Sequence, residues 1–516
     1  MINQGRLRSF LILLGTATFG LITADIACAQ HEAMGGSLKD VSSVSPSRSP
    51  RKPSKPPATR PTTSTTRRRT TPPGRTASLP EEDFNRVADK LFSENKYDDA
   101  LEAYRKAVIQ NPKLASAHYR IGWILNEQGA YQQAIAPLNE AVRVQPNYPV
   151  ALVELSYSYR NLKRYEEALA ANRQATRLKP DYAKAHYEIG LIHSDQKQYA
   201  QALEALKEAV RYDPNYAEAF SEMGYVQRRL GKPQEAITTY KQALRLKPAL
   251  ASAHMGLGDV YYYNTKQYAE AIQAYREGVR YEPQNSVAHY NLSWAYNELG
   301  QYDNALQSAN EAIRIKSDYP EAYVELGYAN RKLGGKQAKG SPAAKQKFDA
   351  AIAAFRTAFR LRANYALAYT SLGDLYYHDL RDFAQAAEAC KEALRIDPSD
   401  ANTQYKLGWS YNDTGRFSEA LVPLREAIRI KPEYSEAYNE LGYSFHKLNR
   451  YKEAIEEYKK AIRLKSDFVL AHYHLGLSYI ATGNRTGAME QYRILQRLDQ
   501  AKANQLYGRL QPSLRN

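Results

Sequence analysis

The sequence predicts an all-α protein built as a solenoid of helical hairpins, because one pattern recurs every 34 residues. Prolines recur at this interval at Pro112, Pro146, Pro180, Pro214 and Pro248. Alanines keep the same step at Ala100, Ala134, Ala168, Ala202 and Ala236. Each period contains two short stretches of helical patterning, so each unit is expected to be two helices joined by a turn. The chain has 516 residues, more than one core usually supports, and a solenoid escapes this limit because its core grows lengthwise.

Twelve such units can be aligned, and each fixed residue type has a physical reason. The units are expected to begin at residues 81, 115, 149, 183, 217, 251, 286, 320, 366, 401, 435 and 469. Small residues at the eighth and twentieth positions let the two helices of a unit approach closely. A proline near the end cannot continue the second helix, so it terminates that helix. The array is expected to span residues 81–500, followed by a capping helix and tail over 501–516.

These units resemble the tetratricopeptide repeat family. The unit starting at Ala401 carries the family's pattern at Leu407, Gly408, Tyr411, Ala420, Leu424, Ala427 and Pro432. The next unit carries it at Tyr438, Leu441, Gly442, Phe445, Ala454, Tyr458 and Ala461, with Ser466 in place of the proline. The resemblance implies a superhelix whose first helices line a concave groove through positions 5, 9 and 12. These positions lie on one helix face.

Positions 9 and 12 of the groove follow a second period of three units. Consecutive units carry Trp and Asn, then Tyr and Arg, then Asp and Tyr at these two positions. Because Tyr, Trp and Asn can offer both apolar contact and hydrogen bonds, they are the expected ligand contacts. Packing between units is the competing interpretation, mainly for the Trp residues. The predicted groove residues are Tyr119, Trp123, Asn126, Tyr157, Arg160, Tyr225, Arg228, Asp259, Tyr290, Trp294, Asn297, Tyr328, Arg331, Asp374, Tyr405, Trp409, Asn412 and Tyr443.

Three units depart from the 34-residue length. One extra residue lies at the turn between the helices near residues 264–267 and again near 378–381. The unit starting at Pro320 carries about twelve extra residues, by comparison with the 34-residue period. Its segment 334–342 is expected to form a loop, and residues 343–349 should lengthen the second helix. In the capping helix, Leu506, Tyr507 and Leu510 should face inward.

The first 29 residues have the layout of a secretory signal peptide. Arg6 and Arg8 precede an apolar run that ends before Asp25, and small residues surround a cleavage point after Ala29. A lipoprotein signal at Cys28 and an uncleaved anchor are the alternatives. The apolar run is shorter than the roughly 20 residues that a membrane span needs. We therefore expect an exported chain, secreted or periplasmic, with no transmembrane span after cleavage.

Residues 30–80 are expected to be a disordered basic linker, because they are rich in Pro, Ser, Thr and Arg and poor in apolar residues. Residues 31–80 hold ten Lys or Arg against Glu32 and Asp40, which gives +8 of the chain's net charge of +16. Such a segment is either a spacer or a contact with an anionic envelope polymer, for example through Arg67, Arg68 and Arg69.

No pattern in the sequence points to an enzyme, a cofactor or a metal. Neither a glycine-rich phosphate loop, nor a nucleophile elbow, nor a zinc-protease motif occurs. Histidines at positions 4 and 6 recur across units, where they are expected to replace packing residues rather than to bind metal. Cys390 replaces an apolar helix residue and should be a small buried hydrophobe.

The sequence thus predicts an exported, non-catalytic scaffold that binds an extended peptide or a partner protein in its groove. The alternative is a cell-envelope protein that binds polysaccharide through the groove Tyr and Trp and the basic linker. Nucleic acid binding is a third class, against which the signal peptide argues. The sequence does not name the partner, the pathway or the oligomeric state.

Overall fold

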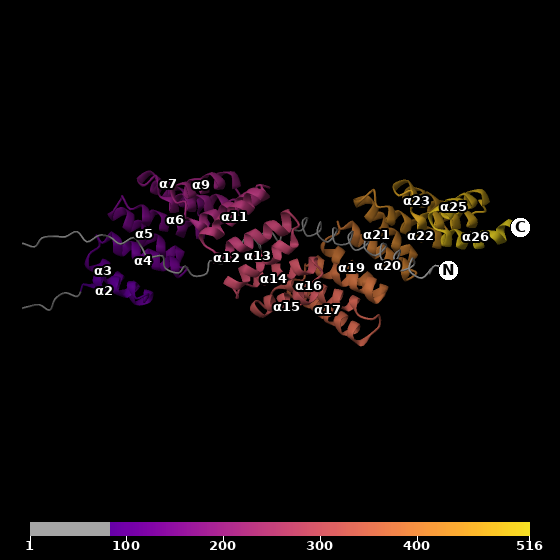
Figure 1. Cartoon of the computed structure of the whole chain (residues 1–516), viewed down its shortest axis with the longest axis horizontal. Coiled ribbons are helices and arrows are strands. Elements are labelled where there is room, and N and C mark those ends of the chain that lie inside the picture. Colours follow the sequence, from indigo (N-terminus) through magenta and orange to yellow (C-terminus); the bar gives the residue numbers. More distant parts are fainter. Residues whose placement is uncertain (1–82, 516) are drawn as a thin grey trace, which may run out of the picture. The chain divides into compact units, whose positions relative to one another are not determined.

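The computed structural model describes residues 83–515, with side chains up to residue 511. The signal segment and nearly all of the basic linker therefore lie outside the described residues. Within the described part every regular element is a helix, so the predicted all-α fold is confirmed. This part divides into two compact units between Leu230 and Gly231. In each unit the helices follow one another in chain order (Figure 1).

The first unit contains nine helices of nearly constant length. They are α2 (Phe84–Ser93), α3 (Tyr97–Gln110), α4 (Ala115–Glu127), α5 (Tyr131–Val144), α6 (Pro149–Asn161), α7 (Tyr165–Leu178), α8 (Ala183–Asp195), α9 (Tyr199–Tyr212) and α10 (Ala217–Arg229). Each helix contacts its neighbours in the chain, as expected for stacked hairpins.

The second unit continues the series, with two π-helical segments. Its helices are α11 (Pro233–Leu246), α12 (Ala251–Asp259), η1 (Val260–Asn264), α13 (Tyr268–Tyr281), α14 (Ser286–Glu298), α15 (Tyr302–Ile315), α16 (Pro320–Lys336), α17 (Pro342–Leu361), α18 (Ala366–Asp374), η2 (Leu375–Leu380), α19 (Phe383–Ile396), α20 (Ala401–Asp413), α21 (Phe417–Ile430), α22 (Ser435–Lys447), α23 (Tyr451–Leu464), α24 (Val469–Ala481), α25 (Arg485–Leu498) and α26 (Gln500–Arg515).

The first helices of the repeats begin at the residues that the 34-residue period indicates. From α4 onward they start at the predicted first residue of each repeat, for example Ala115, Pro149 and Ser435. The turn between the two helices of a repeat holds one residue in the left-handed region, such as Gly129 at φ 75° or Asn449 at φ 60°. Glycine and asparagine tolerate this conformation better than other residues, which explains their frequency there.

The small residue at position 8 lets the two helices of a repeat touch. A Cβ atom at Gly122 would lie 2.3 Å from Leu138 Cγ, and one at Gly408 would lie 2.4 Å from Leu424 Cγ. Both leucines are fully buried. The glycines therefore give the leucines the space they occupy, and this close approach sets the packing of each hairpin.

Histidines at position 4 fasten the start of a repeat to the end of the preceding one. The Nε2 atoms of His118, His186 and His254 lie 3.0, 2.9 and 2.9 Å from the carbonyl oxygens of the prolines six residues earlier. The same contact joins His289 to Pro283 at 3.1 Å. These histidines thus make a specific hydrogen bond, which is more than the packing role that the sequence indicated.

The length variations are accommodated inside the helices. The single extra residues are taken up by η1 and η2, as one-turn π-helices often do, rather than by a longer turn. The expected lengthening of the second helix after residue 342 is confirmed, since α17 has 20 residues. The expected loop over 334–342 is too wide, because α16 stays helical through Lys336 and leaves only residues 337–341 between the two helices. Gly334 packs on the Phe348 ring there, which explains the extra helical turn.

The last helix, α26, packs on α24 and α25. Leu506 and Leu510 are fully buried, as predicted, and Leu506 lies against Gly476. None of the described helices is long and apolar enough to cross a membrane.

Candidate functional site

The predicted asparagines lie between consecutive repeats and are not exposed. Asn126 is 2% exposed, and its Nδ2 donates to the backbone carbonyl of Glu154 at 3.0 Å. Its Oδ1 accepts a hydrogen bond from Ser158 Oγ at 2.7 Å. Each of these bonds runs from α4 to α6, so the side chain joins the first helices of two successive repeats.

The other two asparagines make the same bridge. Asn297 donates to the backbone carbonyl of Glu325 at 3.2 Å and to its carboxylate at 2.7 Å. Asn412 donates to the carbonyl and carboxylate of Glu440, both at 3.1 Å, and accepts from Ser444 at 2.7 Å. The prediction that these asparagines are exposed in a groove is therefore wrong. The next repeat covers the asparagine at position 12 and forms hydrogen bonds with its side-chain amide.

The tyrosines predicted at position 5 also pack inside the array. Tyr119 and Tyr290 are 7% and 6% exposed, and their rings lie 5.4 and 5.2 Å from those of Tyr148 and Tyr319. Tyr405 is half-buried against Tyr434 at 4.9 Å. Because a second tyrosine at the end of each of these three repeats packs on this face, position 5 offers little surface to a ligand there.

The tryptophans at position 9 differ in exposure. Trp294 is buried at 9% exposed, with its ring 4.6 Å from that of Tyr262. Trp123 and Trp409 are half-buried, and the Trp409 ring lies 4.7 Å from that of Tyr377. For Trp294 the structure supports the packing interpretation, whereas the other two tryptophans keep part of their rings accessible.

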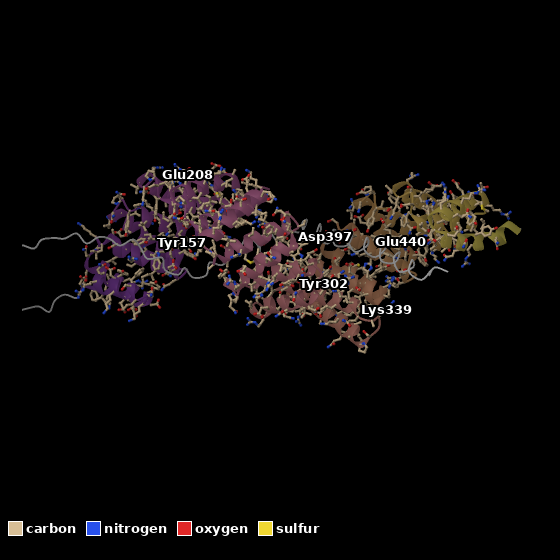
Figure 2. The ribbon with its side chains drawn as sticks, in the orientation of Figure 1. Tyr157, Glu208, Tyr302, Lys339, Asp397 and Glu440 are labelled. Atoms are coloured by element: carbon tan, nitrogen blue, oxygen red, sulfur yellow. The ribbon has the colours of Figure 1, made fainter. Side chains whose placement is uncertain are left out.

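Tyrosines at position 9 form a repeated pair with an aromatic residue of the preceding repeat. We call these pairs the aromatic rungs. They are edge-on contacts with ring centroids 5.9 to 6.4 Å apart, and they comprise Tyr131–Tyr157, Tyr199–Tyr225, Tyr302–Tyr328 and Phe417–Tyr443. All eight rings are half-buried. Figure 2 labels Tyr157 in the first unit and Tyr302 in the second.

One member of every rung was not among the residues predicted to line the groove. Tyr131, Tyr199, Tyr302 and Phe417 open the second helices of their repeats, at a position that the groove pattern did not include. The sequence does contain a signal for this position, because the second helix of most repeats, from Tyr97 onward, begins with an aromatic residue. Only the stacking of repeats shows that this residue meets position 9 of the next repeat.

The predicted groove arginines already have carboxylate partners in the following repeat. Arg160 donates from Nε to Asp195 Oδ2 at 2.6 Å and from a terminal nitrogen to Oδ1 at 3.2 Å. Arg331 donates to Asp379 at 2.6 Å. The guanidinium groups of these two predicted groove residues are therefore already paired within the array. Arg228 is half-buried with its guanidinium 5.7 Å from the Tyr225 ring centroid.

The two predicted aspartates at position 9 are likewise bound within the array. Asp374 pairs with Lys406 at 2.5 Å and lies 3.8 Å from Arg331. Although burial opposes ionisation, these two cations hold the pKa of Asp374 below its ordinary value. Asp259 accepts a hydrogen bond from the Tyr275 hydroxyl at 2.9 Å. The Asp374 carboxylate thus joins neighbouring repeats, whereas the bond between Tyr275 and Asp259 lies within one repeat.

The glutamates that accept from the asparagines differ in their second partner. Glu154 is paired with Lys184 at 2.7 Å. Glu325 and Glu440 form no ion pair among the described residues, and burial raises the pKa of each to about 7. Residue 184 is replaced by Leu367 and Leu470 at the equivalent positions. The same contact between asparagine and glutamate thus occurs with an ion-paired carboxylate at Glu154 and with a carboxyl of raised pKa at Glu325 and Glu440.

The predicted site residues that keep accessible surface include six aromatics at position 9. They are Trp123, Tyr157, Tyr225, Tyr328, Trp409 and Tyr443. In each unit, these rings stand at the same position of three first helices. No group of three or more His, Cys, Asp or Glu in the described part is arranged to hold a metal ion. The arrangement can offer repeated apolar contact with polar edges.

Comparisons with known proteins agree with this architecture. A family profile described as "TPR repeat" matches residues 157–197, 190–231, 408–449 and 442–483. Another, described as "Tetratricopeptide repeat", matches residues 88–149, 221–280, 255–320 and 343–401. Together they cover most of the chain from residue 88 to residue 483. The chain belongs to the tetratricopeptide repeat family, whose members generally act as non-catalytic scaffolds for protein or peptide partners.

Solved structures with similar folds share little sequence with the chain. YrrB, described as a TPR protein with an unusual peptide-binding site, is 22% identical, with 36% of this chain and 95% of that chain covered and a TM-score of 0.30. PilF from Pseudomonas aeruginosa is 23% identical over 40% of this chain and 94% of its own, with a TM-score of 0.37. The Cut9–Hcn1 complex is 13% identical over 84% and 96%, with a TM-score of 0.40. No curated protein sequence matches the chain.

Proposed function

We propose that the chain is an exported scaffold that binds extended segments of a partner protein along the aromatic rungs of each of its two units. The observation that carries the proposal is the recurrence of half-buried ring pairs within each unit, Tyr131–Tyr157 and Tyr199–Tyr225 in the first and Tyr302–Tyr328 and Phe417–Tyr443 in the second. An extended peptide presents side chains along its length, so several rings on one unit suit it. Tyrosine rings also dominate many protein interfaces, because they combine apolar area with a polar edge.

The rungs replace the asparagines and arginines as the proposed contacts. Asn126, Arg160 and their equivalents are engaged by neighbouring repeats, and a ligand would have to break those bonds to use them. The position-9 rings outside the buried Trp294 keep part of their surface accessible. The YrrB description, a TPR protein with a peptide-binding site, agrees in kind with a peptide ligand.

The test is selection of binders from a phage-displayed library of random peptides, using the full mature chain as bait. A selected peptide should bind a Tyr157→Ala, Tyr328→Ala double variant about tenfold more weakly, since each ring contributes roughly 0.5–1.5 kcal/mol beyond its area. Ile109→Ser with Val422→Ser is the matched control, because both residues are exposed apolar side chains on second helices. Equal affinities for all three proteins would contradict the proposal.

The same rings could stack on sugars, so envelope polysaccharide is the competing ligand class. Binding of glycans to the wild-type chain, together with a failure to select any peptide from the library, would favour that alternative. Export itself is tested on the native protein. Its N-terminus should be Gln30, and a cytosolic protein that retains Met1 would contradict the proposed localisation.

A further inference from the structure

The single long insertion of the array forms an ordered, strongly basic projection. We call residues 332–347 the lysine hairpin. It contains five lysines, Lys332, Lys336, Lys339, Lys345 and Lys347, and no acidic residue. Figure 2 labels Lys339, which lies in the short loop between α16 and α17. The insertion therefore adds charge at one place in the second unit.

The lysine hairpin is packed rather than loose. Leu333 and Ala344 are buried, and a Cβ atom at Gly334 would meet the Phe348 ring at 2.7 Å. Ser341 caps α17, since its hydroxyl accepts from the Ala344 amide at 3.1 Å. The lysines are therefore held on an ordered backbone. Binding a partner then costs less conformational entropy of this segment.

Elsewhere in the described part, second-helix cations are often neutralised by their own helix. Arg143, Arg280 and Arg429, for example, each pair with a glutamate three residues earlier. The five lysines of the hairpin have no ion pair among the described residues, although Arg331 beside them is paired with Asp379. Lys336, Lys339 and Lys345 are exposed. Their positive charge is therefore available to a partner.

The lysine hairpin adjoins one of the aromatic rungs. The Lys332 ammonium lies 5.1 Å from the Tyr328 ring centroid, and the Lys336 ammonium lies 4.6 Å from the Tyr302 centroid. Burial lowers the pKa of Lys332, with the neighbouring Arg331 as a further cause. A molecule that reaches the rung Tyr302–Tyr328 would thus meet rings and ammonium groups together.

We infer that the partner segment carries a cluster of Asp or Glu side chains where it passes the rung Tyr302–Tyr328 and the lysine hairpin. This inference rests on the proposed function. Rings beside ammonium groups suit a peptide that mixes acidic and apolar residues better than they suit a uniformly charged polymer. A lipid surface is less suited, because the loop offers only small or polar side chains, such as Ala338 and Gly340, for insertion.

The experiment pans the random peptide library on the full mature chain and on a Lys336→Glu, Lys339→Glu, Lys345→Glu variant. The matched control is Lys106→Glu, Lys241→Glu, Lys452→Glu, which makes the same charge change at exposed second-helix positions. Peptides selected by the wild-type chain should be enriched in Asp and Glu. They should lose at least about tenfold in affinity for the hairpin variant, keep their affinity for the control, and weaken with added salt.

Each alternative outcome has a distinct meaning. Peptides that depend on Tyr157 and Tyr328 but bind the hairpin variant equally well would overturn this inference and leave the proposed function standing. Failure to select any peptide would overturn both. Binding of anionic lipid vesicles or polyphosphate, lost in the hairpin variant while peptides are unaffected, would assign the lysines to another partner. Lys339→Glu alone, in the loop, serves as a second variant if the triple variant unfolds by circular dichroism.

Discussion

Asn126 joins two consecutive repeats, because its Nδ2 donates to the backbone carbonyl of Glu154 at 3.0 Å and its Oδ1 accepts from Ser158 at 2.7 Å. A carbonyl of the next first helix is thereby satisfied by a side chain of the preceding one. The bond lies in a buried place, where losing one partner leaves the other without a substitute from water.

Replacement of Asn126 by alanine should therefore destabilise the first unit by about 1–3 kcal/mol, the range for leaving a buried polar group unsatisfied. Urea unfolding followed by circular dichroism measures the change. Asn139→Ala is the control, because Asn139 is exposed on α5 and should cost well under 1 kcal/mol. An Asn126 variant as stable as the control would show that the hydrogen bonds contribute nothing.

Ala329→Ser should stabilise the second unit. Asn297 Oδ1 is buried without a hydrogen-bond partner, whereas the equivalent oxygens of Asn126 and Asn412 accept from Ser158 and Ser444. Ala329 occupies the position of those serines. A serine hydroxyl there should add roughly 0.5–1 kcal/mol, slightly reduced by its lower helix propensity. Ala353→Ser, exposed on α17, isolates the propensity cost. A lower melting temperature than that of Ala353→Ser would contradict this assignment.

The stability of the second unit should fall as pH rises from about 4.5 to about 7, because burial raises the pKa of Glu325 to about 7 in the folded chain. In this window the folded carboxyl holds a proton that the unfolded one has released. Above about pH 7 the folded carboxyl is ionised as well, and the loss in the free energy of unfolding reaches its full value, on the order of 3 kcal/mol at about 1.4 kcal/mol per pKa unit. Glu325→Gln should remove its own part of this decline, leave the part that Glu440 contributes with its pKa of about 7, and be more stable than wild type at pH 8.

Glu154→Gln is the matched comparison for that prediction. Glu154 accepts from an equivalent asparagine but is paired with Lys184 at 2.7 Å. Its neutral variant should lose stability at pH 8, since Lys184 would be left without its carboxylate. Denaturation midpoints of both variants between pH 4 and pH 8 provide the test. A gain for both variants, or a loss for both, would contradict the difference that we assign to Lys184.

Cys390 should not react with an added thiol reagent in the folded chain. It is 1% exposed, and burial raises the pKa of its thiol to about 12, so the reactive thiolate is scarce near neutral pH. Mature protein at pH 8 should show no rapid thiol reaction until denaturant is added. Reaction of one thiol per chain before unfolding would place Cys390 at an accessible position, provided that cleavage has removed Cys28.

The 34-residue period predicted much of the fold because it reports a packing rule. Proline at the end of a repeat and glycine facing Leu138 constrain the backbone locally, so helix starts such as Ala115 follow from the sequence. The same reasoning misplaced Asn126. Spacing shows which side of a helix a residue occupies, but the next repeat decides whether that side is covered.

The π-helical segments and the rungs were also beyond sequence reasoning. An extra residue near 264 can lengthen a turn or widen the last turn of a helix, and the pattern favours neither. The contact between Tyr131 and Tyr157 depends on how two repeats stack, which is a property of the array rather than of one repeat. The polar bridges and ring pairs thus required the three-dimensional structure.

The most direct test of the proposed binding face is photo-crosslinking with p-benzoylphenylalanine in the full mature chain. The probe replaces Tyr157 or Tyr328 on the rungs, and Ile109 or Val422 on exposed second-helix positions. A peptide selected from the random library, or a partner in native cell extract, should crosslink at Tyr157, at Tyr328 or at both, and be displaced by excess unlabelled peptide. Crosslinking that is equal or stronger at Ile109 or Val422 would contradict the account.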